Sequence, residues 1–212
     1  MRMVFHWKLQ SPAIILSMSA PVSYTHLNQI GMHNVYNAIV AMAVGINYGI
    51  EPSLSKEGLM AYEGVPMRQQ INHLREGIKV IDDTYNASPD SIKSGVSVLV
   101  QLDNTGRKIA VLGDVMELGS LSYQCHYDTG MDLSDARIHE IVTVGTEMKA
   151  LAQAIEDSSS SIKVVSFDDN AQVIDYLKGS IHANDAILVK GSRGMHMEQI
   201  VEQLKDFYKN ES

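Results

Sequence analysis

The chain has 212 residues, of which 45% are hydrophobic and 20% are charged, so it is long and apolar enough to bury a substantial core. Its formal net charge of −8 argues against a nucleic-acid partner, because proteins that neutralise a phosphate backbone usually display a clustered basic surface. The single cysteine, Cys125, excludes an internal disulfide and a four-cysteine zinc site. We therefore expect a cytoplasmic globular protein that binds small molecules.

The first predicted element is an apolar stretch at residues 12–22. It is too short for a membrane span of roughly 20 residues, so we expect none here. The preceding Arg2 and Lys8 give the stretch a weak similarity to a signal peptide. A strand is the better interpretation of three consecutive aliphatic residues, Ile14–Leu16.

Two helices are expected next. Residues 33–48 read as one helix, with a buried side that carries Val35, Ile39, Met42, Ala43 and Ile46. A shorter helix is expected near residues 54–62. Gly64-Val65-Pro66 then interrupts the pattern, because proline disfavours helix in the residue before it and glycine frees the backbone. We place a domain boundary between residues 65 and 66.

Beyond this boundary, short β-branched runs alternate with stretches of helical period, which is a βα pattern. The runs are almost continuously apolar, as in strands buried on both faces of a parallel sheet. They lie at residues 78–81, 108–112, 140–144, 163–167 and 186–190. Helices are expected at about 88–100, 148–155, 171–177 and 197–208. The predicted fold class is α/β, with a Rossmann-like, mostly parallel sheet flanked by helices.

Residues 81–91 place two carboxylates, an aromatic ring and an amide where a strand ends and a helix begins. Ligands bind at such places in open parallel sheets. Asp82 or Asp83 can accept hydrogen bonds from ribose hydroxyls, while Tyr85 can pack on a base. Free amides at the helix start can donate to an anion. The alternative is a loop of residues that only cap the helix, and spacing does not decide between the two.

Residues 111–119 also follow a predicted strand. Gly113 and Gly119 permit tight turns, and Asp114 and Glu117 present anions that can bind an amine or a metal-bound water. Taken by itself, the segment is better interpreted as a turn with two solvated acids.

Residues 188–195 close the last predicted strand with Lys190, Ser192 and Arg193 among glycines. Arg193 can form a bidentate pair with a substrate carboxylate or phosphate. The segment is not a Walker A loop, because here the lysine precedes the glycines. A cationic loop at a strand end is more often a binding loop than a packing element.

Residues 31–38 bring polar side chains together at the start of the first helix. His33 and Asn37 are four apart and Asn34 and Asn37 three apart, so either pair shares a helix face and can hydrogen-bond a purine edge. The alternative is a cap or a satisfied surface group. No acid or second histidine has ligand spacing, so no metal site is predicted here.

These four segments, in this order, resemble the Mur ligase family, whose members use ATP to join an amino acid or peptide to a UDP-muramoyl carboxylate. The strings Asp-Asp-Thr-Tyr-Asn-Ala-Ser-Pro-Asp-Ser, Val-Leu-Gly-Asp-x-Met-Glu-Leu-Gly and Lys-Gly-Ser-Arg-Gly-Met carry the similarity. They resemble the branch that adds D-alanyl-D-alanine to a UDP-N-acetylmuramoyl tripeptide. The match runs from about Gly31 to the end of the chain.

The resemblance implies two domains and two groups of site residues. Residues 1–65 would be the remnant of a central ATP-binding domain, with 1–30 poorly matched, and 66–212 a C-terminal Rossmann-like domain. The residues implied to bind the nucleotide are His33, Asn34 and Asn37 near the adenine, and Arg68 and Asp83 near the ribose and phosphates. Those implied to hold the incoming dipeptide are Asn86, Ser192 and Arg193. No catalytic residue is assigned.

The implied reaction activates the substrate carboxylate with the γ-phosphate of magnesium ATP, after which the dipeptide amine displaces phosphate. Positioning and charge neutralisation would do most of the catalytic work. The sequence shows no Gly-Lys-Thr phosphate loop and no uridine-binding domain. Mg²⁺ would therefore be held mainly by a part of the central domain that this sequence lacks, and the chain alone, expected to be a monomer, would be inactive.

Two other interpretations stay open. One is a different ATP-dependent amide ligase of the superfamily, such as a folylpolyglutamate or cyanophycin synthetase, against which the string at residues 82–89 argues. The other is a non-catalytic module that binds nucleotide or peptide, which the missing phosphate loop keeps possible.

Overall fold

The computed structural model divides the chain into two units, one ending at Glu63 and the other starting at Gly64. It describes residues 6–10, 13–17 and 31–209. The boundary predicted from the sequence lies about two residues further along. The assignment of the two units to a central ATP-binding domain and a C-terminal domain stays a prediction.

The first unit contains a hairpin and two helices. Strands β1 (His6–Gln10) and β2 (Ala13–Ser17) pair antiparallel, so part of the predicted strand at residues 12–22 is confirmed and the rest lies outside the described residues. Helices α1 (Met32–Asn47) and α2 (Pro52–Met60) follow. None of the helices in the described part of the chain combines the length and hydropathy that a bilayer crossing requires.

Helix α1 packs on α2 through a small residue. Gly45 is buried, and a Cβ built there would lie 2.9 Å from Ser55 Oγ, so glycine permits the close approach of the two helices. Met42 is the one predicted inward residue of α1 that is fully buried, while Val35, Ile39, Ala43 and Ile46 are half-buried.

The second unit is built on a six-stranded sheet with the order β3-β4-β8-β5-β6-β7. Five strands are parallel, and β3 pairs antiparallel with β4 at one edge. The strands are β3 (Gln70–His73), β4 (Lys79–Asp83), β5 (Lys108–Gly113), β6 (Glu140–Val144), β7 (Lys163–Phe167) and β8 (Ala186–Lys190). The predicted fold class and the five predicted strands are confirmed.

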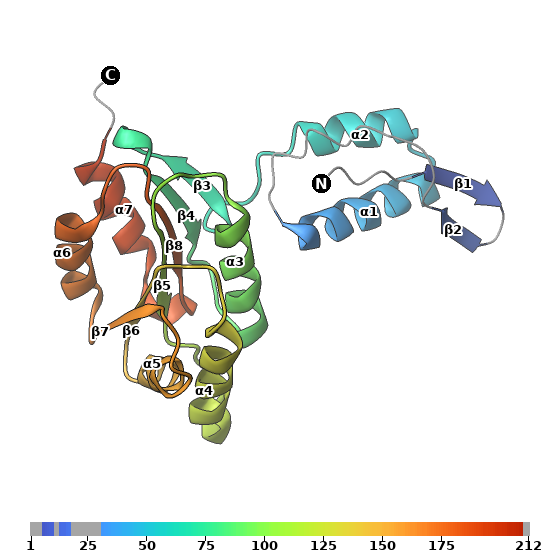
Figure 1. Ribbon diagram of the computed structural model, residues 1–212. Coiled ribbons are helices and arrows are strands. Elements are labelled where there is room, and N and C mark those ends of the chain that lie inside the picture. The colour runs from blue at the N-terminus through green and yellow to red at the C-terminus, as the bar shows by residue number, and fades with distance from the viewer. Residues whose placement is uncertain (1–5, 11–12, 18–30, 210–212) are drawn as a thin grey trace. The chain divides into compact units, whose positions relative to one another are not determined.

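Helices cover both faces of this sheet, with α3 and α4 on one side and α6 and α7 on the other (Figure 1). They are α3 (Pro89–Gln101), α4 (Ser122–Leu133), α5 (Met148–Asp157), α6 (Asn170–Ser180) and α7 (Glu198–Phe207). Short 3₁₀ turns are η1 (Arg75–Gly77), η2 (Gly119–Leu121) and η3 (Arg193–Met195).

The core follows the alternation of side chains along each strand. Val80, Val111 and Val189 face the side where α7 contributes Val201 and Leu204. The intervening residues are also buried and face the opposite side; they include Ile81, Ala110, Leu112 and Leu188. Burial on both faces explains why these strands are continuously apolar.

The prediction of two-sided burial is wrong for one strand. β7 is the outer strand of the sheet, and its five residues are all exposed or half-buried. Its apolar residues Val164, Val165 and Phe167 are half-buried, and Phe167 packs against Tyr176 of α6 with ring centroids 5.2 Å apart.

In the second unit, one strand and one α-helix were not predicted. Strand β3 has one apolar residue, Ile71, among polar ones, so its sequence gives little strand signal, and it pairs antiparallel with β4. Helix α4 has a weak apolar period and buries small or polar residues, among them His126, Thr129 and Gly130. Gly130 lies so near α5 that a Cβ there would be 2.5 Å from the Leu151 carbonyl oxygen.

The topology places the candidate segments at one edge of the sheet. Chain connections leave β4 and β5 through helices on one face, whereas the connection that leaves the strand between them, β8, enters α7 on the other face (Figure 1). In open α/β sheets, ligands bind at such a reversal, beyond the carboxyl ends of the strands.

Candidate functional site

Three predicted segments converge at the carboxyl ends of β4, β8 and β5. Backbone and side-chain bonds join them: the Ser192 amide donates to the Asp114 carbonyl oxygen at 3.1 Å, and Ser192 Oγ accepts from the Met116 amide at 2.9 Å. Lys190 Nζ donates to the carbonyl oxygen of Asn86 at 2.9 Å. The segments predicted separately from the sequence are thus parts of one surface.

The end of β4 carries two buried carboxylates with different partners. Asp82 Oδ1 accepts from Thr84 Oγ1 at 2.6 Å and from the Thr84 amide at 3.2 Å, so this carboxylate organises its own loop. Asp83 Oδ2 lies 2.8 Å from Lys190 Nζ, and both side chains are buried. Of the two candidates for a ribose contact, Asp83 is the one whose carboxylate contacts the neighbouring strand β8, through Lys190.

Arg68 and Tyr85 form a stacked pair beside these carboxylates. The Arg68 guanidinium lies 4.2 Å from the centroid of the Tyr85 ring, and the Tyr85 amide donates to the Met67 carbonyl oxygen at 3.0 Å. Such cation–π contacts hold a guanidinium flat against the ring. One face of Tyr85, predicted to pack on a base, is therefore covered by Arg68.

The start of α3 is capped by its own residues. The Ser91 amide donates to Ser88 Oγ, and the Ser88 amide donates to Ser91 Oγ at 2.8 Å, which is a capping box. The predicted cap and the first-turn Pro89 are confirmed. Because both of these amides already have partners, fewer donors are left for a ligand than the sequence suggested. Asn86 Oδ1 accepts from the Ala87 amide at 2.9 Å.

The loop after β5 is held by hydrogen bonds to the buried side chain of Asp114. The prediction of two solvated acids is therefore wrong for this residue. This buried carboxylate accepts from the Thr146 amide at 3.1 Å and the Met148 amide at 2.8 Å, at the start of α5. Glu117 is exposed, with a φ of 66°.

His126, which the sequence did not single out, supports the same loop. Its Nε2 lies 3.0 Å from the Val115 amide and its Nδ1 lies 2.8 Å from the Ser122 carbonyl oxygen. The first contact requires an acceptor and the second a donor, so the ring is neutral with its proton on Nδ1.

The loop after β8 contains one buried and one exposed candidate. Ser192 is buried, whereas the Arg193 side chain is 54% exposed and is thus available to a ligand. Arg193 Nη1 lies 3.4 Å from Glu198 Oε1 and 3.5 Å from Met67 Sδ. Arg193 therefore reaches the segment that carries Arg68. Glu198, at the start of α7, was missed because its pairing depends on the turn between it and Arg193.

The remaining predicted residues lie on α1, in the first unit. The side chain of His33 lies outside the described residues; Asn34 is half-buried and Asn37 is exposed. The described residues contain no group of three or more His, Cys, Asp or Glu that could hold a metal ion.

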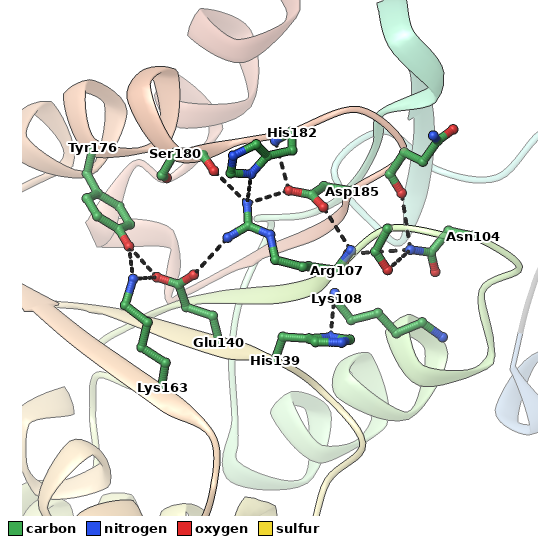
Figure 2. A network of polar contacts seen from close by, with 12 residues as sticks. Asn104, Arg107, Lys108, His139, Glu140, Lys163, Tyr176, Ser180, His182 and Asp185 are labelled. Carbon is green, nitrogen blue, oxygen red and sulfur yellow. Dashed lines mark hydrogen bonds and ion pairs between the residues drawn. The ribbon is translucent and has the colours of Figure 1, made fainter.

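A second polar network lies at the opposite ends of the strands (Figure 2). Arg107 Nη2 bonds Asp185 Oδ2 at 2.6 Å and His182 Nδ1 at 2.8 Å, and the bond to Asp185 raises the pKa of Arg107. Glu140, which is buried, binds Lys163 at 3.0 Å and also Tyr176. Arg107 and Asp185 immediately precede β5 and β8, and Glu140 and Lys163 are the first residues of β6 and β7. The network therefore lies at the amino ends of the strands, away from the candidate site.

The parallel sheet, flanked by helices and with three polar loops at its reversal, defines a Rossmann-like α/β domain. Residues 67–193 match the family described as Mur ligase, glutamate ligase domain, and the chain belongs to the Mur ligase family.

Two curated relatives carry the name UDP-N-acetylmuramoyl-tripeptide–D-alanyl-D-alanine ligase. The protein of Bacillus subtilis is 33% identical over 82% of this chain and 38% of its own length, and that of Escherichia coli is 34% identical over 83% and 38%. The chain thus spans about two fifths of the length of these relatives.

Solved structures agree on the fold. A crystal structure of MurF from Acinetobacter baumannii is 27% identical, has a TM-score of 0.77, and is matched over 97% of this chain and 43% of that one. MurF from Thermotoga maritima, in complex with ADP, is 21% identical, with a TM-score of 0.72, over 96% of this chain and 46% of that one. The second likeness supports the fold alone.

Proposed function

We propose that this chain is the C-terminal part of an ATP-dependent ligase that joins D-alanyl-D-alanine to a UDP-N-acetylmuramoyl tripeptide. The observation that carries the proposal is the convergence of the three signature segments at the reversal of the sheet. The names of the relatives supply the reaction. We place the reaction in the cytoplasm, where ATP is available, and expect the protein to act as a monomer.

The dipeptide requires a cation for its carboxylate. Arg193 suits that role because its guanidinium is largely exposed at the carboxyl edge and can form two parallel bonds to a carboxylate. Ser192 Oγ already accepts from Met116, but its own hydroxyl hydrogen is still available to donate. Asn86 lies across the same edge, on the loop after β4, and completes the proposed dipeptide group.

The nucleotide requires contacts for its ribose, phosphates and base. Arg68, fixed on the Tyr85 ring, presents a positive charge to the phosphates, and Asp83 can accept from ribose hydroxyls. We propose that His33, Asn34 and Asn37 of α1 contact the adenine.

In the proposed reaction, the tripeptide carboxylate takes the γ-phosphoryl group of ATP and releases ADP. The dipeptide amine then forms the amide bond, releases phosphate and loses a proton. The described residues would bind and orient the dipeptide and the nucleotide, so their contribution is alignment of the reacting groups. Mg²⁺ would neutralise phosphate charge, and no step is assigned to it on this chain.

Calorimetric titration of the purified chain tests the proposal. D-alanyl-D-alanine is one titrant, and a non-hydrolysable ATP analogue with magnesium is the other. We expect dipeptide binding that weakens at least about tenfold in Arg193→Ala, which corresponds to about 1.4 kcal/mol. Arg137→Ala, an exposed arginine ahead of β6, is the matched control and should bind normally. Equal dipeptide affinity in both variants, or no binding of either titrant to the wild-type chain, would contradict the assigned sites.

A further inference from the structure

Two buried charges of opposite sign meet where β4 and β8 end. Asp83 and Lys190 are the last residues of these strands and lie directly opposite each other in the parallel register. Lys190 Nζ lies 2.8 Å from Asp83 Oδ2, and Lys190 is only 2% exposed. Lysine is almost never buried this deeply unless it is paired, and here the partner is the Asp83 carboxylate.

The same ammonium group has a second partner. Lys190 Nζ donates to the carbonyl oxygen of Asn86, 104 positions away in the sequence, at 2.9 Å. An ammonium group has three donors, so one cation can hold both oxygens at once. Asp83 belongs to the proposed nucleotide group and Asn86 to the proposed dipeptide group. Lys190 therefore contacts both.

Helix α3 closes over this pair. A Cβ built at Gly95 would lie 3.5 Å from Asp83 Oδ2, 3.5 Å from Lys190 Cδ and 3.2 Å from Leu188 Cδ2. The absence of a side chain at this position thus lets the helix cover the ion pair. In the sequence, Lys190 is followed directly by Gly191 and then by Ser192 and Arg193. Lys190 therefore lies where the end of β4 with its loop, helix α3 and the loop after β8 come together.

Stability alone does not account for such a pair. The cost of removing two charges from water offsets much of their attraction, so well-packed apolar residues are often equally stable in their place. A buried pair can instead fix one arrangement of the groups around it.

We propose that Lys190 is a positioning residue of this site: its ammonium group fixes the Asp83 carboxylate and the Asn86 backbone in one arrangement, so that the nucleotide and dipeptide groups keep a constant spacing. The inference rests on the proposed function for the identity of the two ligands. The arrangement itself is a property of the ligand-free chain.

The first experiment needs no ligand. Amide hydrogen exchange is compared between the wild-type chain, Lys190→Met, the double variant Lys190→Met/Asp83→Asn, and Arg107→Leu. Arg107→Leu is the matched control because it also removes a cation from buried acids, at the opposite end of the sheet (Figure 2). The double variant leaves no buried carboxylate without its cation, so it stays folded even where Lys190→Met does not.

We expect the amides of Tyr85, Ala87 and Ser88 to exchange at least about tenfold faster in both Lys190 variants than in the wild-type chain, after correction for the change in global stability. Arg107→Leu should show no such local effect. Wild-type exchange of these amides in the double variant would overturn the inference, because Lys190 would then do no more than neutralise Asp83.

The second experiment measures ligands on folded protein. We expect Lys190→Met to weaken D-alanyl-D-alanine and the ATP analogue at least about tenfold, whereas Arg107→Leu changes neither affinity more than about twofold. Normal dipeptide affinity in the double variant would overturn the inference and leave the proposed function intact. A wild-type chain that binds neither titrant while its Lys190 variants lose local protection would instead contradict the proposed function and support the positioning role.

Discussion

Asp114 Oδ1 accepts a hydrogen bond from the backbone amide of Met148 at 2.8 Å, although 34 positions separate the two residues. With the bond from the Thr146 amide, this carboxylate satisfies two donors at the start of α5. Asp114, the first residue after β5, thereby anchors α5, the helix that follows the neighbouring strand β6. The loop that carries Met116 against Ser192 is fixed by the same residue.

Asp114→Ala should lower the free energy of unfolding by about 2–3 kcal/mol, because it removes charge-assisted bonds and leaves buried amides without an acceptor. Urea denaturation measures the change. Glu117→Ala, in the same loop but exposed, is the control and should stay within about 0.5 kcal/mol of wild type. Equal effects of the two substitutions would show that the Asp114 contacts are not important for stability.

Gly145→Ala should be destabilising for a related reason. Gly145 has a φ of +104°, and a Cβ there would lie 2.4 Å from Asp114 Oδ2, so the substitution adds backbone strain and displaces the carboxylate. We expect a loss of about 2–4 kcal/mol. Gly179→Ala in α6, where a Cβ meets nothing within 4 Å, should instead gain about 0.5 kcal/mol. Thermal or urea unfolding of both variants checks the contrast, and a neutral Gly145→Ala would refute it.

Tyr208 should make the fold sensitive to alkaline pH. Burial raises the pKa of its phenol above the ordinary value of about 10, and its hydroxyl donates to the Lys178 carbonyl oxygen at 3.3 Å. The folded state thus holds this proton more tightly than the unfolded state. The resulting stability is present below pH ~10 and is lost as pH rises through the folded pKa.

The measurement is the free energy of unfolding between about pH 9 and pH 11. In Tyr208→Phe, the free energy of unfolding should decrease less steeply with pH than in wild type. The Tyr123 ring is exposed, so Tyr123→Phe should leave this slope unchanged. Identical slopes for wild type and Tyr208→Phe would contradict the expected pKa shift.

Glu198→Gln should change ligand binding more than stability. Its ion pair with Arg193 is partly exposed, and such pairs contribute about 0–1 kcal/mol. Without the carboxylate, Arg193 samples more orientations, so we expect D-alanyl-D-alanine to bind about two- to fivefold more weakly. Glu202→Gln, one turn further along α7 and exposed, is the control. Unchanged calorimetric affinity in Glu198→Gln would indicate that Arg193 is oriented by other contacts.

The sequence anticipated the elements that have strong local signals. Continuous β-branched runs predicted β4, β5, β6, β7 and β8, and Ser88 with Pro89 predicted the start of α3. The sequence failed where a neighbour decides the outcome. β7 has the composition of a central strand but lies at the edge, and α4 is helical although its buried face is polar or small except for Leu133. Local composition reports the environment of a segment only on average.

The site shows the same division. The sequence by itself determined the family and the segments that carry Asp83, Asn86, Ser192 and Arg193, because their residue types and order are local properties. Only the tertiary structure decided that Asp83 pairs with Lys190, that Asp114 is buried, and that Glu198 meets Arg193. Those relationships depend on strand order and parallel register, which bring residues more than a hundred positions apart to the same edge of the sheet. Hydrogen bonds and ion pairs act over a few ångströms of space, whatever the separation along the chain.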